Sequence, residues 1–388
     1  MKKRRWGRLP PRPMHGYNHS FLFSSPHGDI SPGPEDLEKP YLIAPATPHP
    51  YLKLGDYFNA ALAFLIEDRY DDLLNALHDQ PGRTSRKGNI RKITIRSEKQ
   101  GAFYHVASVE VKGEGVSRKF SLIAAITDNS RAVLEREYET LALLNARRPS
   151  ASLPRVYFMG NRDLDRAHPK KAFSFLLEEW LEGYHEWHVS LDSTGRQYLC
   201  IWDQDRGYYA ASHKLFFQLF FQAARTMTLL YDPVTSCQVR PWHHAAGDFV
   251  IKNLRDEPCI RLTTVRGYEP LFPSPGERNA LTNLLFFFLD MGVRMRLDRL
   301  DGVGRVTWIK GGIPAAVFKG FFSALKTMSH EGYFEGSVAG DFLDLLKSFS
   351  LQEILTAFKP LIETYDREGE QEELAVILQN LACHAKEL

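Results

Sequence analysis

The sequence has few cysteines and lacks the short motifs that identify several common enzyme classes. Its 388 residues include four cysteines, Cys200, Cys237, Cys259 and Cys383, and no two of them form a C-x-x-C pair. This spacing excludes a zinc ribbon and a disulfide-dense secreted domain. The chain also lacks the G-x-x-x-x-G-K-[ST], G-x-S-x-G, H-E-x-x-H and G-x-G-x-x-G motifs. Their absence argues against a P-loop enzyme, an elbow-type serine hydrolase, a zincin and a Rossmann dehydrogenase.

Long hydrophobic runs are missing as well. The longest dense run, Leu284–Leu289, is far shorter than the roughly 20 apolar residues that a membrane-spanning helix needs, and it predicts a segment of a core helix. The first residues are basic, but prolines and polar residues follow them where a signal peptide has an apolar segment. We therefore expect a reduced, soluble, cytoplasmic protein without a transmembrane segment.

The charge of the chain is uneven. Of its 49 basic residues, six lie in residues 1–14, which contain no acidic residue, so the rest of the chain is mildly acidic. A nucleic-acid partner is therefore not expected, except through this basic N-terminal arm, which could also contact an anionic membrane surface.

Two segments precede the main body of the chain. Residues 1–50 contain ten prolines, which argues against a helix or a central strand and predicts an extended, partly disordered arm that wraps along the body or contacts a partner. Residues 51–89 form a helical appendage and linker: apolar residues recur at helical spacing from Tyr57 to Leu77, with Asp56 as the expected cap. One alternative is that the arm and this helix make the chain a subunit of a larger complex.

The periodicity then changes from helical to strand-like. Period-two alternation and short apolar runs, separated by polar and glycine-containing breaks at 97–101 and 112–115, indicate strands. The expected elements are a three-stranded antiparallel meander at 92–96, 103–111 and 120–126, a helix at 131–145 capped by Asn129 or Ser130, and strands at 156–159 and 173–177. The remainder is mainly helical, with a hairpin near 189–209, a helix at 213–231 and two short strands near 251 and 260–265. The fold class expected is α+β.

The most distinctive polar segment is 241–253, which contains Asp248 and, five residues later, Asn253. A loop carboxylate between a long helix and a strand pair is a common position for a catalytic acid or base. His243 and His244 have no partner at metal-ligand spacing, so we expect them to fix the loop by hydrogen bonds rather than to bind zinc. The alternating charges of 294–301 predict a surface network at the end of a helix.

This element order, with Gly247-Asp248 followed by Asn253, resembles the protein-kinase-like superfamily, and most of all its aminoglycoside-phosphotransferase-like branch. The resemblance implies a two-lobed fold behind an extended N-terminal arm. A small antiparallel β N-lobe with one helix would occupy 90–182, and a larger, mainly helical C-lobe would occupy 183–388 and carry the catalytic-loop-like segment 241–253.

The resemblance also implies roles in nucleotide chemistry. Asp248 would accept the proton of a substrate hydroxyl, and Asn253 would bind a metal ion on the nucleotide phosphates, with ATP and Mg²⁺ as the cofactors.

Five further residues are implied in nucleotide binding. Lys99 and Gly101 belong to the segment 97–101, where the family has its phosphate-covering loop. Glu137 is at the position of the helix glutamate that pairs with the phosphate-binding lysine. Glu179 lies in the hinge-like segment 178–183, whose backbone would hydrogen-bond adenine. Arg266 or Lys99 could supply positive charge to phosphates.

Three positions depart from the family pattern. Ala246 stands where the catalytic-loop motif has its histidine, and His244 lies two residues earlier. The third strand has no lysine, and Ala124 aligns best with its position, while Thr264 stands where the family has a second metal-binding aspartate. A hydroxyl is a poor replacement for a carboxylate around Mg²⁺. The sequence therefore predicts a kinase-like, nucleotide-binding protein that would phosphorylate a hydroxyl of a small molecule. The alternative is a pseudokinase, a regulatory or binding module without phosphoryl transfer. Whether the protein is an enzyme stays open at this point.

Overall fold

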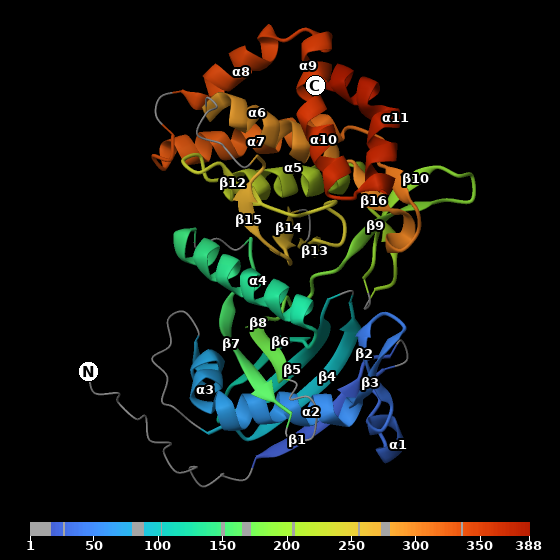
Figure 1. Cartoon of the computed structure of the whole chain (residues 1–388), viewed down its shortest axis with the longest axis vertical. Helices are drawn as coiled ribbons and strands as arrows, with labels where there is room; N and C mark the ends of the chain where they lie inside the picture. The colour runs from blue at the N-terminus through green and yellow to red at the C-terminus, as the bar shows by residue number, and fades with distance from the viewer. Residues whose placement is uncertain are drawn as a thin grey trace. The chain divides into compact units, whose positions relative to one another are not determined.

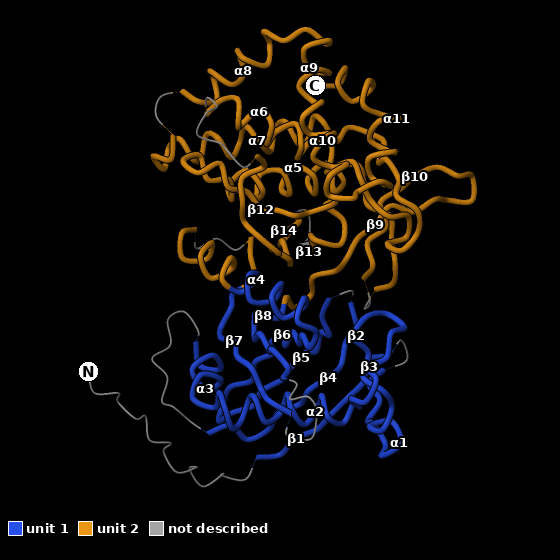
Figure 2. The backbone as a smooth tube through the Cα atoms, in the orientation of Figure 1, with its two compact units in different colours: residues 1–138, 155–180 blue, residues 139–154, 181–388 orange. Residues whose placement is uncertain are grey.

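The computed structural model places the chain in two compact units (Figure 2). Unit 1 comprises residues 1–138 and 155–180, and unit 2 comprises 139–154 and 181–388. The structure describes residues 17–25, 28–79, 89–101, 103–148, 152–164, 172–203, 206–254, 257–272, 280–334 and 337–388, without the side chains of 253, 254 and 257. The basic residues of 1–14 and most of the polar link near 80–89 lie outside these ranges.

Unit 1 is built on a six-stranded sheet in the order β1-β4-β5-β6-β8-β7. All neighbouring pairs are antiparallel except β1 and β4, which are parallel. The elements are β1 (Asn18–Phe23), α1 (Pro34–Leu37), β2 (Pro40–Ala44), β3 (Thr47–Lys53), α2 (Leu54–Ala63), a π-helical segment (Phe64–Asp68), α3 (Tyr70–His78), β4 (Lys92–Gln100), β5 (His105–Lys112), β6 (Ser117–Ala125), α4 (Asp128–Arg147, which continues into unit 2), β7 (Val156–Asp163) and β8 (Ala172–Glu179).

The two faces of this sheet are covered by different helices. Alternate residues of the strands, such as Ile95, Val109 and Phe175, pack with Phe58 and Leu73 of the N-terminal helices in one continuous core. Figure 1 shows α2 and α3 beside the sheet. The other face contacts α4 through a smaller cluster of apolar residues: Ile123, Ala125, Leu134 and Leu176. The period of two along each strand separates these two sets of side chains.

The N-terminal segment is more ordered than its prolines predict. Within residues 17–50, β1 pairs along the edge of the sheet, β2 pairs with β3, and α1 forms a four-residue helix, so the expectation of an arm without helix is wrong there. Proline is compatible with these elements because it is tolerated in the first turn of a helix and in edge strands. Tyr41 and Leu52 are buried in the core of unit 1.

Several element boundaries also differ from the expectation. Helix α2 begins at Leu54 because the Asp56 carboxylate accepts a hydrogen bond from the Lys53 backbone N–H at 3.0 Å. The predicted loop at 97–101 belongs largely to β4, which continues past a bulge between Ser97 and Lys99. Helix α4 is preceded by Thr127, whose side-chain oxygen accepts from the Ser130 backbone N–H at 3.1 Å.

Unit 2 is mainly helical, with four small sheets. Its elements are β9 (Trp187–Leu191), β10 (Gln197–Ile201), β11 (Tyr209–Ala210), α5 (His213–Leu229), β12 (Cys237–Val239), β13 (Phe249–Leu254), β14 (Glu257–Leu262), β15 (Tyr268–Pro270), α6 (Ala280–Arg294), β16 (Leu297–Arg299), a 3₁₀ turn (Leu300–Gly302), β17 (Val306–Trp308), α7 (Ile313–His330), α8 (Val338–Ser348), α9 (Leu351–Ala357), α10 (Lys359–Arg367) and α11 (Gln371–Glu387). Helix α5 packs along α7 and leads to the polar segment that carries Asp248 (Figure 1).

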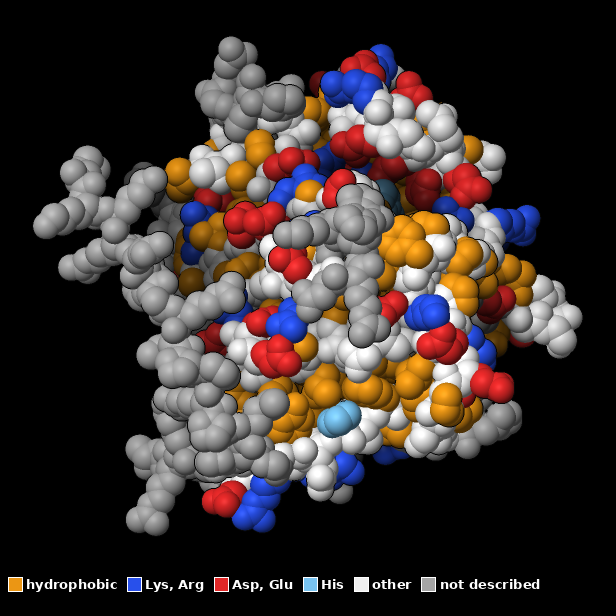
Figure 3. Space-filling view, turned by 60° about the horizontal axis from the view of Figure 1, so that its bottom comes forward, with side chains coloured by type: hydrophobic (Ala, Val, Ile, Leu, Met, Phe, Trp, Pro, Cys, Tyr) orange, Lys and Arg blue, Asp and Glu red, His pale blue; other side chains and the backbone are white. Residues whose placement is uncertain are grey.

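The chain is therefore an α+β protein with a mainly antiparallel sheet in its N-terminal region and a helical C-terminal region. In the part of the chain that the structure describes, no helix is both long and apolar enough to cross a membrane. Basic and acidic side chains are interspersed on the face shown in Figure 3, as a mildly acidic body predicts.

Candidate functional site

The segment from Arg240 to Asp248 connects β12 to β13 and is held at both ends by backbone contacts. The Arg240 N–H donates to the Gly267 carbonyl at 3.0 Å, just before β15. A β-carbon at Gly267 would lie 2.5 Å from the Arg240 carbonyl oxygen, so this approach requires glycine. Gly247 has a φ of +83°, a conformation that glycine adopts without strain and that turns the chain into Asp248.

Asp248 is buried, and its backbone and side chain have different partners. Its carbonyl accepts from the Thr263 N–H at 2.8 Å and from the Thr263 hydroxyl at 2.9 Å. Its carboxylate lies 3.8 Å from Nη2 of Arg266. Burial raises the pKa of Asp248, and the positive charge of Arg266 and the neighbouring His244 and His243 offset part of that rise. The carboxyl group is thus a better proton acceptor than an exposed aspartate.

The two histidines of the segment make loop-fixing contacts, as expected. His244 Nδ1 lies 2.7 Å from the Ala246 carbonyl oxygen, and His243 Nδ1 lies 2.7 Å from the Glu370 carboxylate. Within the described residues, no group of three or more histidine, cysteine, aspartate or glutamate side chains could hold a metal ion.

Glu370, which precedes α11, also joins a buried ionic network. Arg294 donates to both Glu370 oxygens, at 3.2 and 3.1 Å, and to Asp290 at 3.0 Å, while the Tyr365 hydroxyl donates to Asp290 at 2.6 Å. Arg294 is 2% exposed, so the surface network expected for 294–301 is wrong at this residue. The charges point inward because the C-terminal helices α10 and α11 cover the end of α6, a long-range contact that local charge alternation does not reveal.

The region around Asp248 departs from the loop that the sequence predicts. Residues 249–253 belong to β13, and Asn253 lies opposite Pro258 in the hairpin with β14. An extended strand advances about 3.3 Å per residue, so the backbone of Asn253 is several strand positions from Asp248. The side chain proposed as a metal ligand lies outside the described residues. Thr264, at the position of the second metal-binding aspartate, follows Thr263 directly, and their hydroxyl oxygens are 3.5 Å apart.

In unit 1, two glutamates approach each other on the α4 face of the sheet. Glu137 on α4 is 3% exposed and Glu178 on β8 is 7% exposed. Burial raises the pKa of Glu178 well above its usual value, and the charge of Glu137 raises it further, while a hydrogen bond with Ser121 lowers it. Oε2 of Glu178 is buried and has no hydrogen-bond partner among the described residues.

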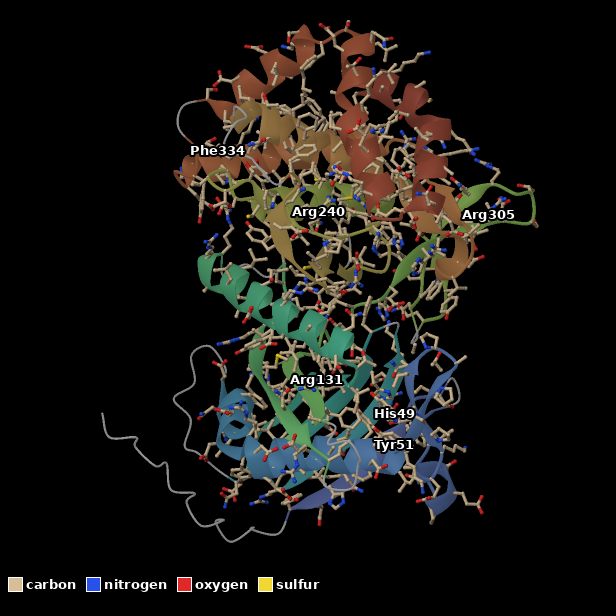
Figure 4. All side chains as sticks on the ribbon, viewed as in Figure 1. His49, Tyr51, Arg131, Arg240, Arg305 and Phe334 are labelled. Carbon is tan, nitrogen blue, oxygen red and sulfur yellow. The ribbon has the colours of Figure 1, made fainter. Side chains whose placement is uncertain are left out.

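The lysine on the corresponding face of β6 is Lys119, whose Nζ lies over the Trp180 ring, 4.2 Å from its centroid. Ser121 lies opposite Glu178, and Ile123 and Ala125 pack with α4. Ala124, which aligned best with the missing lysine, instead points into the core on the opposite face. Arg131 of α4 is a second basic residue on this face, and its Nε donates to the Ser174 hydroxyl at 3.0 Å (Figure 4).

The remaining predicted site residues lie at the ends of strands in unit 1. Lys99 is exposed opposite Val106, and the Gly101 N–H donates to the Tyr104 carbonyl at 2.8 Å in a short turn. Glu179 belongs to the segment whose backbone was predicted to hydrogen-bond adenine. Its N–H donates to the Arg155 carbonyl at 2.8 Å. The chain passes from unit 1 to unit 2 directly after Trp180, inside the predicted hinge segment 178–183.

A buried histidine that the sequence did not predict, His188, lies beside the Asp248 loop. His188 of β9 contacts Asp298 at 3.1 Å through Nδ1, and the same carboxylate accepts from the Val189 N–H at 2.7 Å. A β-carbon at Gly247 would lie 3.7 Å from Cε1 of His188, so the turn rests against this ring. His188 falls within an ordinary strand pattern, and its partner is 110 residues away, so the sequence gives no signal for the pair.

A hollow in the described part of unit 2 is separate from this cluster. Its lining includes Tyr231, Ser236, Gln238 and Phe272, and none of the lining residues belongs to the Asp248 cluster. We give more weight to the Asp248 cluster because it combines a buried carboxylate with an arginine and two histidines.

Comparison with known proteins does not assign the chain to a family. No protein-family model matches the chain, and no curated protein matches its sequence.

Proposed function

We propose that this chain is a pseudokinase: a kinase-like protein that binds a nucleotide without transferring its phosphoryl group. The observation that carries the proposal is the buried approach of Glu137 to Glu178. Where the resemblance implies a glutamate–lysine pair that holds phosphates, this chain has two carboxyl groups.

The two carboxyl groups are unsuited to holding phosphates during transfer. Phosphoryl transfer depends on cations that position the phosphates and neutralise developing charge. A second carboxyl group beside Glu137 supplies no positive charge to a phosphate. The β6 residues opposite Glu178 and against α4 are Ser121, Ile123 and Ala125, while Lys119 of the same face lies over the Trp180 ring. Thr264 likewise replaces a carboxylate that would bind a metal ion.

The arrangement of elements supports the kinase-like part of the proposal. Strands β4 to β8 form five antiparallel-paired strands, with α4 inserted after the third, as the resemblance implies for an N-lobe. In unit 2, a long helix precedes the polar segment, and the hairpin of β13 and β14 follows Asp248. The chain order of these features agrees with the order that the resemblance implies.

The experiment compares nucleotide binding with turnover in the full chain. We expect ATP and ADP to raise the melting temperature, because a ligand that binds only the folded state stabilises it. We also expect ATP consumption no faster than in an Asp248→Asn variant, with a panel of small hydroxyl compounds as acceptors. Turnover that Asp248→Asn abolishes would instead establish the active phosphotransferase. Absence of any nucleotide binding would contradict both forms of the hypothesis.

A further inference from the structure

The oxygen donors around Asp248 do not fit a Mg²⁺ ion. Mg²⁺ prefers octahedral oxygen coordination and is usually bound through one or two carboxylates together with phosphates. Here the described neighbours of the Asp248 carboxylate are a guanidinium and two imidazoles, which are cations or cation-forming groups. The nearby Thr263 hydroxyl already donates to the Asp248 carbonyl. The fixed positive charge beside Asp248 is therefore the Arg266 guanidinium, which repels a metal ion.

Arg266 is the side chain best placed to bind an anion. Its Nη2 is 3.8 Å from Asp248, which is too long for a hydrogen bond. Its Nε is buried and has no hydrogen-bond partner among the described residues. The side chain is 27% exposed, so solvent reaches part of the guanidinium. Val265 before it is fully buried, which anchors the backbone.

The buried Nε–H of Arg266 therefore needs a hydrogen-bond acceptor that the described residues do not supply. A guanidinium has five N–H donors in a planar fork that matches the oxygens of a phosphate. Leaving a buried donor without an acceptor destabilises the folded protein, and a bound anion would remove that cost. Asp248 is a poor permanent partner because it is too distant to accept a hydrogen bond.

We propose that Arg266 binds the phosphate groups of a polyphosphate ligand directly, in place of a metal ion, so that binding does not require a divalent cation. This inference rests on the proposed function for the identity of the ligand as a nucleotide. Asp248 then opposes binding, because its carboxylate repels phosphate and attracts the same guanidinium. The site works as a direct arginine–phosphate contact in which the would-be catalytic residue is inhibitory.

Two probes separate this inference from the proposed function. ATP tests the whole nucleotide site, while inorganic tripolyphosphate tests the anion site without adenine. Titration calorimetry on the full chain would measure both ligands in EDTA and in excess Mg²⁺. We expect ATP to bind in EDTA at least as tightly as in Mg²⁺, because the metal ion masks phosphate charge that Arg266 recognises.

Three variants give matched comparisons. Arg266→Gln should weaken both ligands by about 10- to 100-fold, the usual effect of removing a charge-assisted hydrogen bond. Asp248→Asn should tighten both by several-fold, because it removes the competing carboxylate while keeping the shape of the side chain. Arg305→Gln is the control, since Arg305 is exposed and lies well away from Arg240, the neighbour of Gly267 (Figure 4). It should leave both affinities unchanged.

The outcomes are distinct. Binding of ATP only in the presence of Mg²⁺ overturns the inference and leaves the pseudokinase proposal intact. ATP binding with the same affinity in Arg266→Gln as in the natural chain has the same two consequences. Tripolyphosphate binding that depends on Arg266, without ATP binding, supports the anion site and refutes the nucleotide proposal. If Arg266→Gln fails to fold, the Asp248→Asn variant decides: weaker binding in that variant refutes the competition that the inference requires.

Discussion

The guanidinium of Arg266 lies 3.8 Å from the carboxylate of Asp248, close enough for ionic attraction and too far for a hydrogen bond. Asp248 is therefore a buried carboxylate whose loss of hydration is only partly offset by the positive charge of Arg266. Two roles can be proposed for Asp248 from this contact. It could act as a general base in phosphoryl transfer, or its charge could compete with a ligand for Arg266.

Replacing Asp248 by asparagine should stabilise the folded protein at neutral pH. Because burial raises the pKa of Asp248, the folded state binds its proton more tightly than the unfolded state does. The resulting stability is complete below the unfolded pKa and is lost as the pH rises through the folded pKa. Urea unfolding of Asp248→Asn at pH 7 should show a gain on the order of 1 kcal/mol that shrinks toward pH 4. An equal gain at both pH values would assign the effect to packing.

The buried carboxyl of Glu178 should behave in the same way in unit 1. Glu178→Gln keeps a group that can hydrogen-bond Ser121 and removes the repulsion from Glu137. Because the pKa of Glu178 is raised, its favourable contribution disappears as the pH rises, so the variant should gain roughly 1 kcal/mol at pH 8 relative to pH 5. Glu110→Gln, at a half-buried position of β5 whose carboxylate pairs with Lys112, is the control and should show no such gain at pH 8. A loss of stability at pH 8 would refute the carboxyl–carboxyl repulsion.

Loss of Glu370 should destabilise the protein strongly. Although burial alone would raise it, hydrogen bonds and charges from His243 and Arg294 hold the pKa of Glu370 at about 2. Removing one partner of a buried ion pair typically costs about 3–5 kcal/mol, and Glu370→Gln should lose an amount near the lower end because Arg294 keeps Asp290.

The pH dependence and a matched variant test that assignment. The stabilisation from Glu370 is present above the unfolded pKa and is lost as the pH falls toward 2, so the variant and the natural chain should converge in acid. Glu372→Gln removes an exposed partner of Arg299 and should cost less than about 1 kcal/mol. Chemical denaturation measures both, and equal losses in the two variants would contradict the network.

His384 should make the protein sensitive to mild acid. Burial, reinforced by the positive charge of Arg296, lowers the pKa of His384 to about 3. Neither ring nitrogen has a hydrogen-bond partner among the described residues. The stability that depends on neutral His384 is complete above pH 6.5 and is lost as the pH falls toward 3, by up to about 1.4 kcal/mol per pH unit.

Variants of two histidines separate this effect from general acid denaturation. His384→Leu should flatten the fall in unfolding free energy between pH 7 and pH 5, while His330→Leu, at an exposed position of α7, should leave it unchanged. Some slope should persist in His384→Leu because burial also lowers the pKa of His105 in unit 1, to about 4. An unaltered slope in His384→Leu would show that the group is not buried as a neutral imidazole.

Periodicity in the sequence predicted most of the elements between β4 and α5. The alternating segments that became β4, β5 and β6, the helix that became α4 and the long helix α5 were all expected near their observed positions. These elements follow from local rules: the period of side chains along the backbone, and polar or glycine-containing breaks. Cap positions and the bulge in β4 were missed because they depend on single hydrogen bonds.

The sequence by itself determined the fold class, the order of the elements from β4 to α5 and the position of Asp248 before a strand pair, because each of these depends on neighbours in the chain. Only the tertiary structure decided which charges meet. It brought Glu178 to Glu137, His188 to Asp298 and Arg294 to Glu370, and it turned Ala124 away from α4. Strand register and the packing of distant helices determine which side chains come into contact. Burial then determines how strongly each charge interacts with its neighbours.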